Sequence, residues 1–153
     1  MIKRDSKIKV SIIIRTKNEE KWIESCLKSI FNQNFKSFEV ILVDNESTDQ
    51  TVKIAKKFNV KVVKISNFKP GLAINAGIKK SKGKIIVCIS GHCIPVNNSW
   101  LKNLIKDVDN KNIAGVYGRQ EPLSFSSDLD KRDLINTFGL DKKIQKKDTF
   151  FHN

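Results

Sequence analysis

The sequence has 153 residues, and its 29 Lys and Arg against 16 Asp and Glu give a formal net charge of +13 at pH 7. With 39% hydrophobic and 29% charged residues, the composition is that of an ordinary globular protein, which disfavours fibrous and intrinsically disordered classes. At this length we expect a single domain over residues 1–153, in which residues 1–8 form a basic N-terminal extension.

No apolar run approaches the roughly 18 to 20 residues that cross a bilayer, and no signal-peptide core follows Met1, so a cytoplasmic location is expected. The three cysteines, Cys26, Cys88 and Cys93, are odd in number and form no CxxC pair. They argue against a disulfide framework and a structural zinc site, and we expect reduced, mostly buried thiols.

The positive charge is compatible with two kinds of partner: polyanions such as nucleic acid, or an anionic membrane face and phosphorylated small molecules. The sequence contains no RRM-type aromatic strand motif and no zinc-finger spacing. Nucleic acid is therefore the unlikely partner.

Apolar strand-like runs alternate with segments of helical period, which predicts an α/β fold with a mostly parallel sheet flanked by helices. The first run, Val10–Ile14, is uniformly apolar or β-branched apart from one serine and should be central, with both faces covered. Asn18 is the predicted N-cap of the following helix, with Glu19 and Glu20 in its first turn. The apolar stripe of this helix is Trp22, Ile23, Cys26, Leu27, Ile30 and Phe31.

The second strand is expected at Phe38–Val43, and Ser47 or Thr48 should cap a short helix after it. Val60–Ile65 alternates apolar residues with lysines, so this third strand should meet water on one face or at an edge. Pro70 opens a helix that runs to about Lys80.

A fourth apolar strand is predicted at Ile85–Ile89, then a helix marked by Trp100 to Val108 and a strand at Ile113–Tyr117. A last helix is expected near Asp130 to Phe138. The sequence ends on Phe150-Phe151-His152-Asn153, and an exposed pair of Phe side chains would form a sticky patch. Either these aromatics dock back on the fold or the natural chain continues, and we expect a fragment or a truncated gene product.

In an open parallel sheet, ligands bind beyond the carboxyl ends of the strands. Asp44 lies at such an end, and its carboxylate has two interpretations: contact with a base edge or ribose, or a turn and capping role. For Asp49 the capping role is favoured. His92 beside Cys93 does not make a metal site, because two adjacent ligands are too few. The polar residues that follow the strands are Arg15, Thr16, Asn18, Asp44, Asn45, Ser47, Asp49, Ser90 and His92.

The sequence contains no GxGxxG, no P-loop and no Gly-x-Ser-x-Gly elbow, which argues against dehydrogenases, NTPases and serine hydrolases. Four segments, taken in order and at their spacing, instead resemble family 2 glycosyltransferases of the inverting GT-A fold. They are Val10–Glu19, Val43–Thr51, Gly71–Gly77 and Gly83–Val87. The resemblance covers about Lys9 to Tyr117. The stretches Tyr117–Gln120 and Phe150–Asn153 also look like a subset of this family that builds bacterial surface polysaccharides.

The resemblance implies a GT-A fold incomplete at its C-terminus, with residues 118–153 as part of an acceptor-side region. It implies a nucleotide-sugar donor and a glycan or lipid-linked acceptor. Carried over by position, Arg15 and Thr16 line the nucleoside pocket, Asp44 and Asn45 meet base and ribose, and Asn75 lies near the diphosphate. The full set of nucleotide-sugar-binding residues implied in this way is Arg15, Thr16, Asn18, Glu19, Asp44, Asn45, Asn75, Ser90 and Gly91.

The family's Asp-x-Asp, whose carboxylates hold a divalent ion on the diphosphate, reads Ser90-Gly91-His92 here. His92 is the one candidate metal ligand of this triplet, and an imidazole suits Mn²⁺ or Zn²⁺ better than Mg²⁺. Dependence on Mn²⁺ or Mg²⁺ is thus in question. Without a metal, the phosphates need cationic partners, for which Arg15, Lys17 and Lys69 are candidates.

An inverting transferase also needs a carboxylate that takes the acceptor's proton. In the family this base lies beyond the position where the present sequence stops, so no catalytic residue is assigned. Two functions remain: a glycosyltransferase or its donor-binding fragment, peripheral to the inner membrane face, or a catalytically inactive module that binds nucleotide or glycan.

Overall fold

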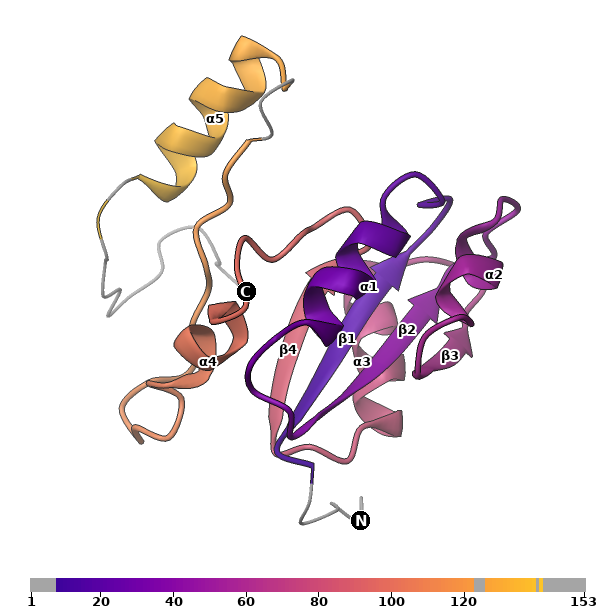
Figure 1. Cartoon of the computed structure of the whole chain (residues 1–153), viewed down its shortest axis with the longest axis horizontal. Helices are drawn as coiled ribbons and strands as arrows, with labels where there is room; N and C mark the ends of the chain where they lie inside the picture. Colours follow the sequence, from indigo (N-terminus) through magenta and orange to yellow (C-terminus); the bar gives the residue numbers. More distant parts are fainter. Residues whose placement is uncertain (1–7, 123–125, 140, 142–153) are drawn as a thin grey trace. The chain divides into compact units, whose positions relative to one another are not determined.

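The chain is built around a four-stranded parallel sheet with the strand order β3-β2-β1-β4 (Figure 1). The computed structural model describes residues 8–122, 126–139 and 141. Its strands are β1 (Val10–Thr16), β2 (Phe38–Asp44), β3 (Val60–Lys64) and β4 (Ile85–Ser90). The register aligns Thr16 with Asp44 and Arg15 with Ser90, so the polar residues that end these strands come together at one edge. The α/β class and the edge position of the third strand are confirmed.

Alternate side chains of β1 enter two separate cores. Val10, Ile12 and Ile14 are fully buried in the core on one face of the sheet, and Ile13 is fully buried in the core on the other. The apolar run of β1, in which Ser11 is the one polar residue from Val10 to Ile14, is therefore explained by cover on both faces, as predicted.

Helices cover both faces of this sheet (Figure 1). The first core receives Cys26 of α1, Ala55 of α2 and Leu101 of α4, and the second receives Ala73 of α3. The predicted extent of the helix from Pro70 is confirmed. The helices are α1 (Ile23–Phe31), α2 (Thr51–Ala55), α3 (Pro70–Lys80), α4 (Trp100–Ile105) and α5 (Asp128–Phe138).

A buried glutamine after α1 holds the loop between β4 and α4. Gln33 is fully buried, and its Oε1 accepts a hydrogen bond of 2.9 Å from the N–H of Leu101. Its Nε2 donates to the carbonyls of Asn97 at 2.7 Å and Ser29 at 3.1 Å. Every polar atom of this amide has a hydrogen-bond partner. These bonds compensate for the loss of hydration when the side chain is buried.

Two predictions from the sequence are wrong. The segment Ile113–Tyr117 forms no strand, since no other strand of the described residues pairs with it. The cysteines are free, but only Cys26 is buried; Cys88 is exposed on the edge strand β4, and Cys93 is half-buried.

The chain divides into two compact units, Met1–Val116 and Tyr117–Asn153, with the border close to the predicted start of the acceptor-side region. The single-domain organisation stays a prediction. In the second unit, α5 confirms the last expected helix. Most of the basic extension 1–8 and the pair Phe150-Phe151 lie outside the described residues. Within the described part of the chain, no helix is both long enough and apolar enough to cross a bilayer.

Candidate functional site

The loops that follow β1 and β2 are joined by hydrogen bonds at the carboxyl edge of the sheet. Asn18 has a positive φ of 55°, and its Oδ1 accepts the N–H of Thr48 at 2.9 Å. The N–H of Asn18 donates to Ser47 Oγ at 2.9 Å, and the N–H of Glu19 donates to Thr51 Oγ1 at 2.7 Å. An asparagine suits this position because Asn tolerates the left-handed region better than most residues.

The same bonds explain why the predicted caps of the first two helices are wrong. Helix α1 starts at Ile23 with Trp22 as its N-cap, so Asn18, Glu19 and Glu20 precede the helix. The side chains of Asn18 and Glu20 instead accept hydrogen bonds from the loop after β2: Glu20 Oε2 accepts the N–H of Gln50 at 2.9 Å. An N-cap bonds to its own helix, whereas these side chains bond to a loop about 30 positions away in the sequence.

Helix α2 starts at Thr51 with Gln50 as its N-cap, so neither Ser47 nor Thr48 caps it. Asp49 instead accepts the N–H of Thr51 at 2.9 Å and the N–H of Glu20 at 3.0 Å. Partial burial raises the pKa of Asp49, but these hydrogen bonds outweigh it and hold the pKa below its usual value. The capping interpretation of Asp49 agrees with these contacts.

Asp44 is 1% exposed at the end of β2 and has hydrogen-bond partners for both carboxylate oxygens. Its Oδ1 accepts from Ser47 Oγ at 2.5 Å and Thr16 Oγ1 at 3.3 Å, and its Oδ2 accepts the N–H of Ser47 at 3.1 Å. Asn45 is also buried and donates its N–H to the carbonyl of Thr16 at 2.9 Å. The turn interpretation of Asp44 accounts for these bonds, and contact of Asp44 with a base or ribose stays a prediction.

Beside Asp44 lies a hollow of about 480 Å³, which is within the size range of small-molecule sites. Sequence reasoning missed Lys64 and Ser66, which line it from the end of β3 and the residues after it. The alternation of Lys64 with apolar neighbours indicates only solvent exposure, and its place beside Asp44 follows from the parallel register of β2 and β3. The hollow is lined by Asp44, Glu46, Ser47, Thr48, Lys64, Ile65 and Ser66.

Hydrogen bonds join the triplet Ser90-Gly91-His92, at the end of β4, to the end of β1. Arg15 Nη2 donates to Ser90 Oγ at 3.2 Å, and the N–H of Gly91 donates to the carbonyl of Arg15 at 2.9 Å. Arg15 Nε is buried without a hydrogen-bond partner. His92 Nδ1 lies 2.7 Å from Glu19 Oε1, so the triplet contacts the loop after β1 as well as the strand itself.

The residues of this triplet do not fit a resident divalent ion. No group of three or more His, Cys, Asp or Glu among residues 8–122, 126–139 and 141 could hold a metal. The one imidazole of the triplet is that of His92, whose Nδ1 is already occupied by Glu19. The triplet therefore lacks the carboxylates that would hold an ion in the absence of a diphosphate, and a divalent ion bound together with the donor stays a prediction.

Three other candidate residues, Asn75, Lys17 and Lys69, are exposed to solvent. Asn75 is exposed on α3, and no hydrogen bond recorded for the described residues joins it to the other predicted site residues. Lys17 and Lys69 are exposed near the ends of β1 and β3. The structure therefore brings Arg15, Thr16, Asn18, Glu19, Asp44, Asn45, Ser90, Gly91 and His92 to one edge of the sheet, and a place for Asn75 near the diphosphate stays a prediction.

Solved structures show the same fold. The chain superposes with a TM-score of 0.65 on the mannosyltransferase PcManGT from Pyrobaculum calidifontis, solved in complex with GDP-Man and Mn²⁺, at 23% identity over 69% of this chain and 33% of that one. It superposes with a TM-score of 0.62 on Staphylococcus aureus TarS 1–349 in complex with UDP-GlcNAc, at 32% identity over 76% of this chain and 38% of that one. The fold is GT-A.

Relatives in sequence point to the same group of proteins. A Methanococcus voltae dolichyl N-acetyl-α-D-glucosaminyl phosphate 3-β-D-2,3-diacetamido-2,3-dideoxy-β-D-glucuronosyltransferase is 33% identical over 71% of this chain and 38% of its own length. The poly(ribitol-phosphate) β-N-acetylglucosaminyltransferase TarS of S. aureus is 31% identical over 85% of this chain and 25% of its own length. The chain thus spans about a quarter to two fifths of these relatives. The model of glycosyl transferase family 2 matches residues 11–152, and the chain belongs to this family.

Proposed function

We propose that this chain is the donor-binding part of an inverting glycosyltransferase that moves a sugar from a nucleotide-sugar to a glycan or lipid-linked acceptor in polysaccharide biosynthesis. Family membership supports the reaction class. The 32% identity to TarS, which was solved with UDP-GlcNAc, supports a nucleotide-sugar as the donor. The names of the relatives, which act on poly(ribitol-phosphate) and a dolichyl-linked sugar phosphate, support the acceptor class.

The observation that carries this proposal is the hollow beside Asp44 at the carboxyl edge of the sheet. Its lining offers the buried Asp44 carboxylate, the hydroxyls of Ser47 and Ser66, and the Lys64 ammonium around an open space. Such an arrangement can bind the base and ribose of a nucleotide, which need several hydrogen-bonding groups in a partly dry cleft. In this proposal the neighbouring Arg15 side chain, held by Ser90, faces the diphosphate.

In the proposed reaction, the acceptor hydroxyl attacks the anomeric carbon and the nucleoside diphosphate leaves, with inversion. The described residues bind and orient the donor, which brings the reacting carbon into a fixed position. Arg15 supplies positive charge where negative charge develops on the leaving diphosphate. The base that takes the acceptor's proton is not assigned, and we propose that Tyr117–Asn153 is part of the acceptor side.

Calorimetric titration of the purified chain with UDP-, dTDP- and GDP-sugars, each with and without Mn²⁺, tests the proposal. We expect at least one donor to bind, and Asp44→Ala to remove binding at a temperature where the variant is folded. Asp109→Ala, which removes an exposed carboxylate, is the matched control and should bind as the unaltered chain does. If no nucleotide binds with or without Mn²⁺, the donor-binding proposal is wrong. Binding without transfer or hydrolysis of a labelled donor would instead favour the inactive binding module.

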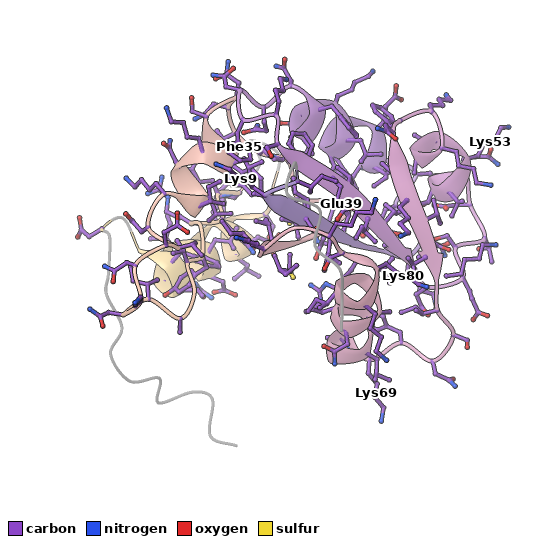
Figure 2. The ribbon with its side chains drawn as sticks, turned by 90° about the horizontal axis from the view of Figure 1, so that it is seen from below. Lys9, Phe35, Glu39, Lys53, Lys69 and Lys80 are labelled. Carbon is purple, nitrogen blue, oxygen red and sulfur yellow. The ribbon has the colours of Figure 1, made fainter. Side chains whose placement is uncertain are left out.

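We also propose that the chain works in the cytoplasm at an anionic membrane face, where lipid-linked acceptors lie. The net charge of +13 supports this, as do exposed lysines such as Lys53, Lys69 and Lys80, whose side chains project from the ribbon in Figure 2. Binding to vesicles that contain anionic lipid should fall as salt rises, because salt screens the attraction. Binding that is absent, or that does not change with salt, would contradict this part of the proposal.

A further inference from the structure

Glu19 and His92 form a short side-chain contact in which one partner is sheltered and the other is exposed. Glu19 Oε1 lies 2.7 Å from His92 Nδ1, while the side chain of Glu19 is 17% exposed and that of His92 is 57% exposed. The carboxylate is therefore the sheltered partner, and the imidazole is the partner that a ligand can reach. The two residues come from different loops, 73 positions apart in the sequence.

Two other contacts hold Glu19 in place. Its N–H donates to Thr51 Oγ1 at 2.7 Å, which fixes the backbone, and Thr51 is itself fully buried. Gly91 lets the side chain pass: a Cβ at this position would lie 3.0 Å from Glu19 Cγ and 2.8 Å from Thr16 Cγ2. Because Gly91 has no Cβ, the side chain of Glu19 can pass beside it and contact His92.

The geometry determines which nitrogen of His92 carries the proton in the neutral ring. An ionised carboxylate can only accept hydrogen bonds, so the proton lies on Nδ1, between the ring and Glu19. Nε2 is then an electron-pair donor with no proton of its own. Such a nitrogen can accept a hydrogen bond from a hydroxyl or bind a metal ion.

A hydroxyl group is the better match for this nitrogen. Among the described residues, no group of three or more His, Cys, Asp or Glu surrounds His92, and the carboxylate beside it, that of Glu19, is already bonded to Nδ1. A sugar carries several hydroxyl groups, each of which can donate to an imidazole nitrogen. Positive charge for the diphosphate is available next to the triplet from Arg15, which Ser90 holds at 3.2 Å.

We propose that Glu19 is a positioning residue that fixes His92 as the Nδ1–H tautomer, and that His92 Nε2 accepts a hydrogen bond from a hydroxyl of the donor sugar. His92 is then a specificity-determining residue for the sugar, and the triplet Ser90-Gly91-His92 acts without a resident metal. This inference rests on the proposed function, since it requires a nucleotide-sugar at this edge of the sheet.

The first test reads the tautomer directly by nitrogen-15 NMR of the full chain at pH 8. The sequence contains two histidines, so His92→Ala assigns the signals. We expect Nδ1 to be protonated and Nε2 unprotonated in the unaltered chain, whereas Glu19→Gln, whose amide can either accept or donate, should weaken this preference. Glu19→Ala should lose this preference, while Glu24→Ala, an exposed carboxylate of α1, should keep it. A protonated Nε2 in the unaltered chain would overturn the inference.

The second test compares each nucleotide-sugar with its nucleoside diphosphate by calorimetry in the presence of EDTA. We expect a panel of UDP-GlcNAc, UDP-glucose and GDP-mannose to contain one donor that binds about 3- to 10-fold more tightly than its diphosphate, the size of one net hydrogen bond. His92→Ala should abolish this increment and Glu19→Ala should reduce it, with the affinity of each variant for the diphosphate as the reference against which the increment is taken.

The outcomes separate this inference from the proposed function. Loss of diphosphate affinity in His92→Ala, or broadening of the His92 signals by Mn²⁺ before nucleotide is added, would assign the imidazole to the phosphates or a metal and overturn the inference alone. Equal affinity for every sugar and its diphosphate would also overturn it. Failure of every nucleotide to bind, with or without Mn²⁺, would overturn the proposed function and the inference together.

Discussion

Replacement of Asp44 by alanine should destabilise the chain even when no ligand is present. The change removes the acceptor of three hydrogen bonds, from Ser47 Oγ, the N–H of Ser47 and Thr16 Oγ1. A hydrogen bond to a charged group contributes about 1.5 to 3 kcal/mol, which gives an upper bound of about 4.5 to 9 kcal/mol for three. Two effects reduce this sum: the cost of burying the carboxylate disappears, and Ser47 Oγ keeps the N–H of Asn18 as a donor.

We therefore expect the free energy of unfolding to fall by about 3 kcal/mol in Asp44→Ala, within the range for loss of a buried polar network. For a chain of this size each kcal/mol shifts the melting temperature by about 2 to 4 °C, so the variant should melt about 6 to 12 °C lower. Thermal unfolding followed by circular dichroism at neutral pH measures the shift. If Asp44→Ala melts together with the exposed control Asp109→Ala, the bonds assigned to Asp44 do not hold the turn.

Gly77→Ala on α3 should lower the free energy of unfolding by about 1 kcal/mol in urea denaturation, because the new Cβ lies 2.6 Å from Ile13 Cγ2 and overpacking outweighs the gain in helix propensity. Gly71→Ala, with nothing within 4 Å, should not destabilise, and equal effects of the two changes would refute the packing argument. Burial raises the pKa of Cys26 to about 12, so a thiol reagent at pH 8 should modify Cys26 only on unfolding and the exposed Cys88 before it, although burial also raises the pKa of Cys88. Because the pKa of Asp49 is lowered in the folded chain, its stabilising effect is present above the unfolded pKa of about 4 and is lost as pH falls through the folded pKa. The difference in melting temperature between the unaltered chain and Asp49→Asn should therefore shrink at low pH, and a constant difference would contradict the assignment.

The periodicity of apolar residues predicted the strands of the sheet correctly, whereas the capping residues of the first two helices were predicted wrongly. The run Val10–Ile14, apolar except for Ser11, predicted a central strand, because cover on both faces favours apolar residues on both sides of a strand. The lysines of the third strand predicted contact with water on one face or at an edge, and the strand order places β3 at an edge. Pro70 marked the start of α3, because proline fixes a backbone angle that suits the first helical turn.

Contacts between distant loops could not be predicted in the same way. Asn18 has the chemistry of an N-cap, but its Oδ1 accepts from Thr48, 30 positions away. Lys64 has the chemistry of a solvent-exposed strand residue, but it lines the hollow because the end of β3 lies beside Asp44. A local pattern cannot distinguish these alternatives, since the competing partner is brought near only when the sheet has formed.

The bonds that made the capping predictions wrong also explain how the candidate site can be ordered before a ligand arrives. The loop after β1 is joined to the loop after β2 by the bonds of Asn18, Glu19 and Glu20, and to the triplet after β4 by the contact of Glu19 with His92. Glu19 is thus shared by three loops: its backbone contacts Thr51 and its side chain contacts His92. The entropy cost of ordering these loops is met during folding, so less of the binding energy of a ligand is lost in arranging them. A polar residue that precedes a helix without capping it, as Glu19 does, is therefore best examined for a partner on a neighbouring strand end.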